Sequence, residues 1–203
     1  MGASQEGISE KFPLDKARSL YGTTKLASEL LIQEYNQMYG LQTVINRCAV
    51  LTGPGQFGKV DQGVVVLWVA KHFWNQSLSY IGYGGNGKQV RDILHIEDLY
   101  NLIDYQIHNL EILNGEIMNV GGGLEVSVSL MELTSYCQKY TGNTIPIKKI
   151  PNNREADIPI FITNNQKVTS LTGWKPQKTV DNIVSEIHQW IIENENQLRN
   201  ILK

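Results

Sequence analysis

An unbroken apolar run followed by a glycine turn limits what this chain can fold into. Residues 42–51 are rich in β-branched and apolar side chains, as in a strand buried on both faces of a parallel sheet. The run follows a helical pattern that stops at Gly40 and ends in the turn 52–55, Thr-Gly-Pro-Gly. A second such run, 115–120, leads into three glycines. This order predicts an α/β fold with ligands at the carboxyl ends of parallel strands.

Periodicity and capping signals assign the other elements. Apolar spacing predicts helices over 63–74, 96–107, 129–142 and 180–191, and short strands over 78–83, 88–95 and 145–150. Ser129 and Glu132 match a capping box, and Thr179 is a plausible cap for the last helix. Residues 1–18 are polar and predict a loop, and 171–176 predict a turn.

Composition excludes several classes of function. A chain of 203 residues with 41% apolar content can bury a core, and a net charge of −2 gives no reason to expect nucleic-acid or acidic-membrane binding. The sequence contains neither an apolar run long enough to span a membrane nor a signal peptide, so we expect a cytoplasmic protein. Cys48 and Cys137 lie in apolar segments and are interpreted as reduced core residues. The four histidines lack metal-ligand spacing with Cys or Asp, so no metal site is expected.

Tyr21 and Lys25 are candidates for proton transfer. They lie four residues apart in the helical pattern that ends at Gly40, so their side chains project from one face. An ammonium group stabilises a nearby phenolate, and such a pair is suited to accepting a proton from a sugar or alcohol hydroxyl. The same spacing also fits an ordinary surface pair on a helix whose apolar face carries Leu26, Leu30, Leu31, Tyr35 and Met38.

Two further stretches carry candidate binding residues. Arg91 lies in a predicted strand after a glycine-rich loop, where its guanidinium could bind a phosphate through two hydrogen bonds or pair with a nearby carboxylate. His95, at the strand-to-helix junction, fits a structural hydrogen bonder. On the loop 154–157, Arg154 could neutralise a second phosphate and Asp157 could accept from a ribose hydroxyl, unless the loop is simply a solvated charged segment.

A series of short motifs occurs in the order and spacing of extended short-chain dehydrogenases. From Gly7 onward the chain resembles the NAD-dependent nucleotide-sugar epimerase/dehydratase family, and within it most closely the CDP-paratose (CDP-tyvelose) 2-epimerases. The motifs are Tyr21…Lys25, Arg47…Gly53-Pro54, Arg91-Asp92…His95…Asp98, Asn119-Val120-Gly121, Arg154-Glu155-Ala156-Asp157 and Gly173-Trp174-Lys175-Pro176.

The resemblance implies roles for these residues. Tyr21 would be the catalytic base and acid, and Lys25 would hold the nicotinamide ribose of NAD. Arg47 and Val50 would lie in the cofactor-binding region, and Val50 replaces an Asn found in many relatives, so the sugar is expected to be a deoxy sugar. The substrate, a CDP-linked sugar rather than a UDP-linked one, would be bound by Tyr80, Tyr83, Arg91, Arg154 and Asp157.

The chain also departs from the family pattern. Family members begin with a strand and a Gly-x-x-Gly-x-x-Gly turn that holds the NAD pyrophosphate, and they carry a Ser or Thr farther upstream than the 20 residues that precede Tyr21 here. We therefore expect the carboxyl-terminal portion of a longer enzyme, inactive or nearly so alone and a poor binder of NAD. Its exposed sheet edge would favour association, and a homo-oligomer is possible.

The expected architecture is a partial Rossmann-type doubly wound parallel sheet plus a smaller α/β substrate-binding domain. Residues 7–55 and 89–126 would belong to the NAD-binding sheet, and 56–88 and 127–203 to the substrate domain. Three readings of the function stay open: a 2-epimerase of a CDP-linked sugar, a 4-epimerase or 4,6-dehydratase of the same family, and a non-catalytic nucleotide-sugar-binding fragment or subunit of a split enzyme.

Overall fold

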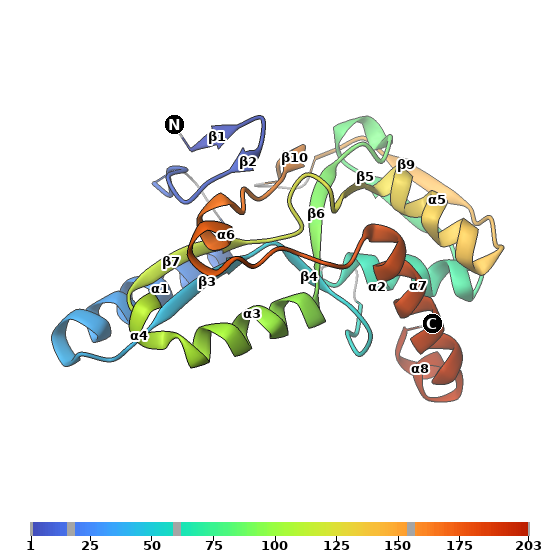
Figure 1. Ribbon diagram of the computed structural model, residues 1–203. Coiled ribbons are helices and arrows are strands. Elements are labelled where there is room, and N and C mark those ends of the chain that lie inside the picture. Colours follow the sequence, from blue (N-terminus) through green and yellow to red (C-terminus); the bar gives the residue numbers. More distant parts are fainter. Residues whose placement is uncertain (1, 16–18, 59–61, 154–156, 203) are drawn as a thin grey trace.

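The computed structural model describes residues 2–15, 19–58, 62–153 and 157–202 (Figure 1). Within these ranges helices and short strands alternate along the chain. The helices are α1 (Leu20–Tyr39), α2 (Val64–Phe73), α3 (Ile96–His108), α4 (Leu110–Leu113), α5 (Leu130–Thr141), α6 (Gln166–Thr172), α7 (Val180–Glu193) and α8 (Glu195–Leu202), with a short 3-10 turn, η1 (Tyr83–Gly85). The strands are β1 (Ala3–Ser4), β2 (Gly7–Ile8), β3 (Val44–Cys48), β4 (Val50–Thr52), β5 (Leu78–Ile81), β6 (Val90–His95), β7 (Glu116–Val120), β8 (Ser127–Ser129), β9 (Ile147–Ile150) and β10 (Ile160–Phe161).

Parallel pairing dominates these strands, which confirms the predicted α/β class. Strand β3 pairs with β7, β5 pairs with β9, and β6 pairs with both β4 and β10, each in parallel. Only β8 against β6 and the small β1–β2 hairpin are antiparallel among the described strands. Figure 1 shows β6 near the middle, with α1 and α3 beside the β3–β7 pair and α2, α5, α7 and α8 gathered on the other side.

The predicted strand 42–51 is wrong as a single element. It breaks at Ala49, whose N–H donates to Val120 O at 2.9 Å, and its two parts pair with different partners. In register, Val44 lies opposite Glu116 and Val50 opposite Ile93. The segment therefore passes from the β3–β7 pair to the β4–β6 pair, a change of partner that an apolar run cannot reveal.

Cys48, at the end of β3, is exposed, so its interpretation as a core residue is wrong. Strand β3 carries a single buried residue, Ile45, because the described chain covers little of its surface. Cys137 is fully buried as predicted, and burial raises the pKa of its thiol. Both cysteines are free thiols.

Two clusters of buried apolar side chains hold the fold together. The larger cluster joins α2, α5, α7 and α8 and includes Ile93 of β6. The smaller cluster joins β6, β7, α3 and α6 and includes Leu94 of β6 and Val168 of α6. Because successive side chains of a strand point to opposite faces, Ile93 and Leu94 enter different clusters, and β6 connects the two.

Side chains cap the starts of several helices, and two of these caps were predicted. The Ser129 hydroxyl accepts from the N–H of Glu132 at 3.2 Å while the Glu132 carboxylate accepts from Ser129 N–H at 2.8 Å, which is the predicted capping box. Thr179 caps α7, and His95 caps α3 by accepting from the N–H of Glu97 at 3.2 Å. The structural role expected for His95 is thus confirmed.

The amino-terminal segment is more ordered than the predicted loop. It holds the β1–β2 hairpin, and Ile8 N–H donates to Ile162 O at 2.7 Å beside a parallel bridge to Thr163. The carboxylate of Glu10 accepts from Asn119 N–H at 2.7 Å, so this segment lies against the end of β7. Among the described residues, no helix is both long enough and apolar enough to cross a bilayer.

Candidate active site

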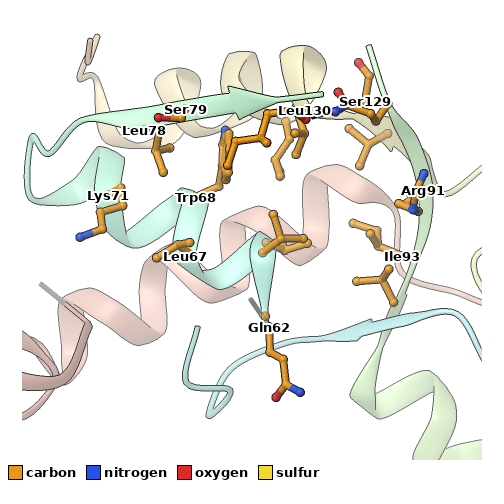
Figure 2. Close-up of a pocket in the computed structure, with 18 of the residues that line it drawn as sticks. Gln62, Leu67, Trp68, Lys71, Leu78, Ser79, Arg91, Ile93, Ser129 and Leu130 are labelled. Carbon is orange, nitrogen blue, oxygen red and sulfur yellow. Dashed lines mark hydrogen bonds between the residues drawn. The ribbon is translucent and has the colours of Figure 1, made fainter. Parts of the chain in front are cut away.

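A cavity of about 600 Å³ lies between α2, β5, β6 and the start of α5 (Figure 2). Apolar side chains make up much of its wall, and Arg91 and Asp157 supply opposite charges there. A hollow of this size with a few convergent polar groups is typical of a small-molecule site. The cavity is lined by Val50, Gln62, Gly63, Val64, Val65, Leu67, Trp68, Lys71, Ser77, Leu78, Ser79, Ile81, Gln89, Arg91, Ile93, Val128, Ser129, Leu130, Leu133 and Asp157.

One face of α2 forms a wall of this cavity, and it was missed in the sequence. Val64, Leu67, Trp68 and Lys71 all line it, and their three- and four-residue spacing places them on one side of the helix (Figure 2). The spacing alone predicts the helix and not the cavity beside it. Lys71 ends this stripe, and its ammonium donates to Gln76, outside the cavity lining.

Arg91 is held by acceptors of the protein itself. Its guanidinium donates to Asp157 Oδ1 at 2.6 Å, to Ile158 O at 2.7 Å and to Val90 O at 2.8 Å. The Arg91 and Asp157 side chains are 27% and 23% exposed, so solvent reaches the pair. Of the two readings of Arg91, the ion pair with a nearby carboxylate is the one present in this structure, and it lies inside the cavity.

The two predicted tyrosines lie beside the cavity lining. Tyr83 begins the 3-10 turn η1 with a φ of 50°, the glycines of this turn also have positive φ, and the Tyr83 hydroxyl donates to Asp157 O at 2.7 Å. Tyr80 stacks on Trp68 with ring centres 6.2 Å apart, and its hydroxyl hydrogen-bonds Thr134 Oγ1 at 2.7 Å. Tyr83 thus contacts a cavity residue, whereas Tyr80 supports the Trp68 wall from behind.

The predicted cofactor-region residues are separated. Val50 of β4 lines the cavity, but Arg47 of β3 pairs with Glu29 of α1, with Arg47 Nε and Nη2 donating at 3.0 and 2.7 Å. Arg47 therefore ties α1 to β3. The predicted phosphate-binding Arg154 lies outside the described residues.

Tyr21 and Lys25 are brought together as predicted. Both lie near the start of α1, which Ser19 caps, and the Lys25 ammonium lies 5.5 Å from the centre of the Tyr21 ring. Tyr21 is 65% exposed, so its phenol is open to a ligand. Neither residue is part of the cavity wall.

Asp92, beside Arg91 but on the other face of β6, is fully buried. Its carboxylate accepts from Gly123 N–H at 3.1 Å and from Thr163, and burial raises its pKa. A Cβ at Gly121 would lie 2.2 Å from Asp92 Oδ2, so only glycine fits there. Asp92 therefore fixes the glycine loop after β7 against the strand that carries Arg91.

A second group of titratable side chains lies at the carboxyl end of β6. His95, Glu97 and Glu186 bring one possible ligand atom each within 4.8 Å of one another. The Lys178 ammonium lies 2.8 Å from both carboxylates, so a cation of the chain already occupies this position. We interpret the group as an ion-pair network between the start of α3 and α7.

Comparison with known proteins places this geometry in context. A family model described as GDP-mannose 4,6 dehydratase matches residues 2–187. The chain is 32% identical over 186 residues to the CDP-paratose 2-epimerase of Salmonella typhi, covering 91% of this chain and 54% of that protein. It spans about half the length of the curated relatives it matches.

Solved structures share the fold. The Pal protein of Bacillus thuringiensis superposes with a TM-score of 0.79 at 28% identity, covering 93% of this chain and 57% of the other. The dTDP-glucose 4,6-dehydratase DesIV of Streptomyces venezuelae, solved with NAD bound, gives 0.78 at 25% identity, covering 96% and 56%. The chain therefore belongs to the GDP-mannose 4,6-dehydratase family, among the short-chain dehydrogenase epimerases and dehydratases of nucleotide sugars.

Proposed function

We propose that this chain supplies the acid/base pair and the substrate cavity of an NAD-dependent epimerase acting on a CDP-linked deoxy sugar. The observation that carries the proposal is the cavity itself, where Arg91 and Asp157 face each other in a member of a nucleotide-sugar family. The similarity to the CDP-paratose 2-epimerase supports CDP as the nucleotide. The proposal includes the division into an NAD-binding part, 7–55 and 89–126, and a substrate part, 56–88 and 127–203.

Each candidate residue then has a chemical role. Arg91 binds the diphosphate through its planar guanidinium, and Arg154 is proposed to neutralise the second phosphate. Asp157 accepts a hydrogen bond from the ribose. The Tyr83 hydroxyl positions Asp157 by donating to the Asp157 backbone oxygen. Val50 in the cavity wall offers no hydrogen bond to the sugar, which favours a deoxy sugar at that position.

Proton transfer is assigned to α1. Tyr21 takes the proton from the reacting sugar hydroxyl and later returns it, and the Lys25 ammonium lies 5.5 Å from the centre of the Tyr21 ring. NAD, when bound, supplies the hydride chemistry, and Lys25 would hold its ribose. The exposed phenol and the ammonium on one helix face fit such a cofactor beside them. Arg47 is proposed to belong to the same region through its contact with Glu29 of α1.

A second candidate is a nucleotide-sugar-binding chain without turnover. The packing of α1 favours this candidate. Helix α1 buries none of its residues, so little of the described chain holds Tyr21 against a substrate. The cavity, in contrast, lies beside the larger apolar cluster. A 4-epimerase or a 4,6-dehydratase would use the same cavity and the same Tyr21, with different groups around the sugar.

Calorimetric titration with CDP, UDP and NAD, each alone, tests these proposals. We expect CDP to bind more tightly than UDP and Arg91→Ala to weaken CDP at least tenfold, because a charge-assisted hydrogen bond is lost. Arg199→Ala is the matched control, since Arg199 pairs with Glu195 on the surface of α8. Equal CDP affinity in both variants would contradict the assigned site, and NAD binding with sugar turnover would exclude the binding-only candidate.

A further inference from the structure

We propose that Asp157 is an exchangeable counter-ion of Arg91. When the diphosphate of a nucleotide enters the cavity it takes the place of the Asp157 carboxylate on Arg91, and the freed carboxylate turns to accept a hydrogen bond from the ribose of the same ligand. This inference rests on the proposed function and deepens it, because it makes Asp157 the residue that distinguishes a nucleotide from a simple phosphate.

The contacts of Arg91 suit such an exchange. Its guanidinium donates to one charged acceptor, Asp157 Oδ1 at 2.6 Å, and to two backbone oxygens. Of these three acceptors only the carboxylate belongs to a side chain, so it is the one that can rotate away from an incoming phosphate while the backbone oxygens stay in place. A diphosphate carries more negative charge than one carboxylate, which favours the exchange at a guanidinium.

The pair is reachable from the cavity. Both residues line it, and their side chains retain 27% and 23% exposure. Partial exposure also keeps the Arg91–Asp157 pair weak, because solvent screens it. A ligand can therefore displace the carboxylate without first unfolding any part of the wall.

The backbone around Asp157 is fixed, so the exchange is a rotation of one side chain. Tyr83 donates to Asp157 O at 2.7 Å, and the N–H of Val90 donates to Pro159 O at 2.9 Å. Two residues later, Phe161 pairs in register with Arg91 itself. Asp157 Oδ1 also accepts from Ile158 N–H at 2.9 Å, so the rotation frees a backbone donor beside the anion.

Removing the Asp157 charge should then act in opposite directions on two ligands. Inorganic pyrophosphate needs Arg91 but has no ribose, so Asp157→Asn should bind it more tightly, by about fivefold for a partly exposed ion pair. CDP gains the same freed arginine but loses the charged ribose acceptor, so its gain should be smaller than that of pyrophosphate or reversed. Asp157→Asn should therefore raise the ratio of the pyrophosphate affinity to the CDP affinity.

The test is calorimetric titration of the wild type and three variants with pyrophosphate and with CDP. Asp157→Asn is compared with Asp104→Asn, which makes the same change of net charge at an exposed residue of α3. Arg91→Ala reports on the site itself, and circular dichroism melting checks that every variant is folded. We expect only Asp157→Asn to raise the pyrophosphate affinity relative to the CDP affinity.

The outcomes separate the exchange from the proposed function. If Arg91→Ala loses both ligands while Asp157→Asn leaves their affinity ratio unchanged, the exchange is wrong and the site stands. If Arg91→Ala binds both ligands like the wild type, the assigned site is wrong and the exchange fails with it. A gain in pyrophosphate affinity shared by Asp104→Asn would be a general charge effect and would also overturn the exchange.

Discussion

Helices α7 and α1 both carry apolar side chains at helical spacing, yet they are packed in opposite ways. Helix α7 buries Val180, Ile183, Val184, Ile187 and Ile191 in the larger cluster. Helix α1 buries none of its residues, and Leu30 and Leu31 are 56% and 60% exposed. Periodicity therefore indicates that a helix has an apolar face, but it does not tell what covers that face.

This difference in packing divides the proposed binding site from the proposed acid/base pair. The cavity with Arg91 lies beside the well-packed cluster, whereas Tyr21 and Lys25 lie on the unburied helix. Regions with few buried apolar contacts open at lower free energy than a packed core. We therefore expect equivalent mutations in the two regions to lower the free energy of unfolding by different amounts, and paired variants can test this expectation.

The largest contrast is expected from truncating one apolar side chain in each helix. Ile187 of α7 is fully buried, and Ile187→Ala should lower the free energy of unfolding by about 2–5 kcal/mol because it leaves a cavity. Leu31→Ala in α1 should change it by less than about 0.5 kcal/mol, since that side chain is exposed. Urea denaturation followed by circular dichroism measures both changes, and similar losses would show that α1 is packed as well as α7.

A slightly smaller contrast is expected from two carboxylates that tie segments together. Buried Asp98 of α3 accepts from the N–H groups of Gln177 and Lys178 at 3.1 and 3.0 Å. Asp98→Ala leaves both donors without this partner and should cost about 2–4 kcal/mol of unfolding free energy. Glu29→Ala removes only the partly exposed pair with Arg47 and should cost about 1 kcal/mol or less. The reverse order in urea denaturation would show that α1 is better anchored than its burial indicates.

The predictable parts of the fold rest on local contacts. The Ser129–Glu132 capping box and the helix of Tyr21 and Lys25 involve residues three or four apart and were predicted from the sequence, and His95 was predicted as a structural hydrogen bonder, though not as a cap. The break at Ala49 was not, because it depends on β7 and β6 lying far along the chain. The exposure of Cys48 was not predicted either, because it depends on how little of the described chain covers β3.

The site was predicted in its residue types but not in its contacts. Arg91 and Asp157 were both chosen as ligand-binding residues, but their ion pair joins positions 66 residues apart and remained one of two readings. The cavity wall of α2 was missed because the side of a helix that borders a hollow depends on what packs around it. The structural role of Asp92 was not predicted, because that role depends on the burial of its side chain, which the residue type does not reveal.

Two helix-capping serines should differ by about 1 kcal/mol in the unfolding free energy that is lost when each is replaced by alanine. Ser129→Ala removes the cap of α5 and should lower the unfolding free energy by about 1–2 kcal/mol. Ser19 accepts from Gly22 N–H at 3.1 Å at the start of α1, and Ser19→Ala should only fray the first turn, with little effect on global unfolding. Amide hydrogen exchange would detect that fraying, and an equal loss in denaturation for both variants would contradict the expected difference.

The smallest expected effect is a pH dependence confined to the packed region. Hydrogen bonds from the Ser129 hydroxyl and N–H lower the pKa of Glu132 below its ordinary value of 4.5. A carboxyl whose pKa is lower in the folded state contributes stability above its unfolded pKa, and this contribution is lost as the pH falls through the folded value.

The difference in unfolding free energy between the wild type and Glu132→Gln should therefore be largest near neutral pH and shrink below about pH 4.5. Helix α1 has no acidic residue in its first turn, so the capping of α1 should add no such dependence. Urea denaturation at a series of pH values measures the difference. A difference that stays constant from neutral pH to pH 3 would mean that the Glu132 charge does not stabilise α5, and the capping box would then act through its neutral hydrogen bonds alone.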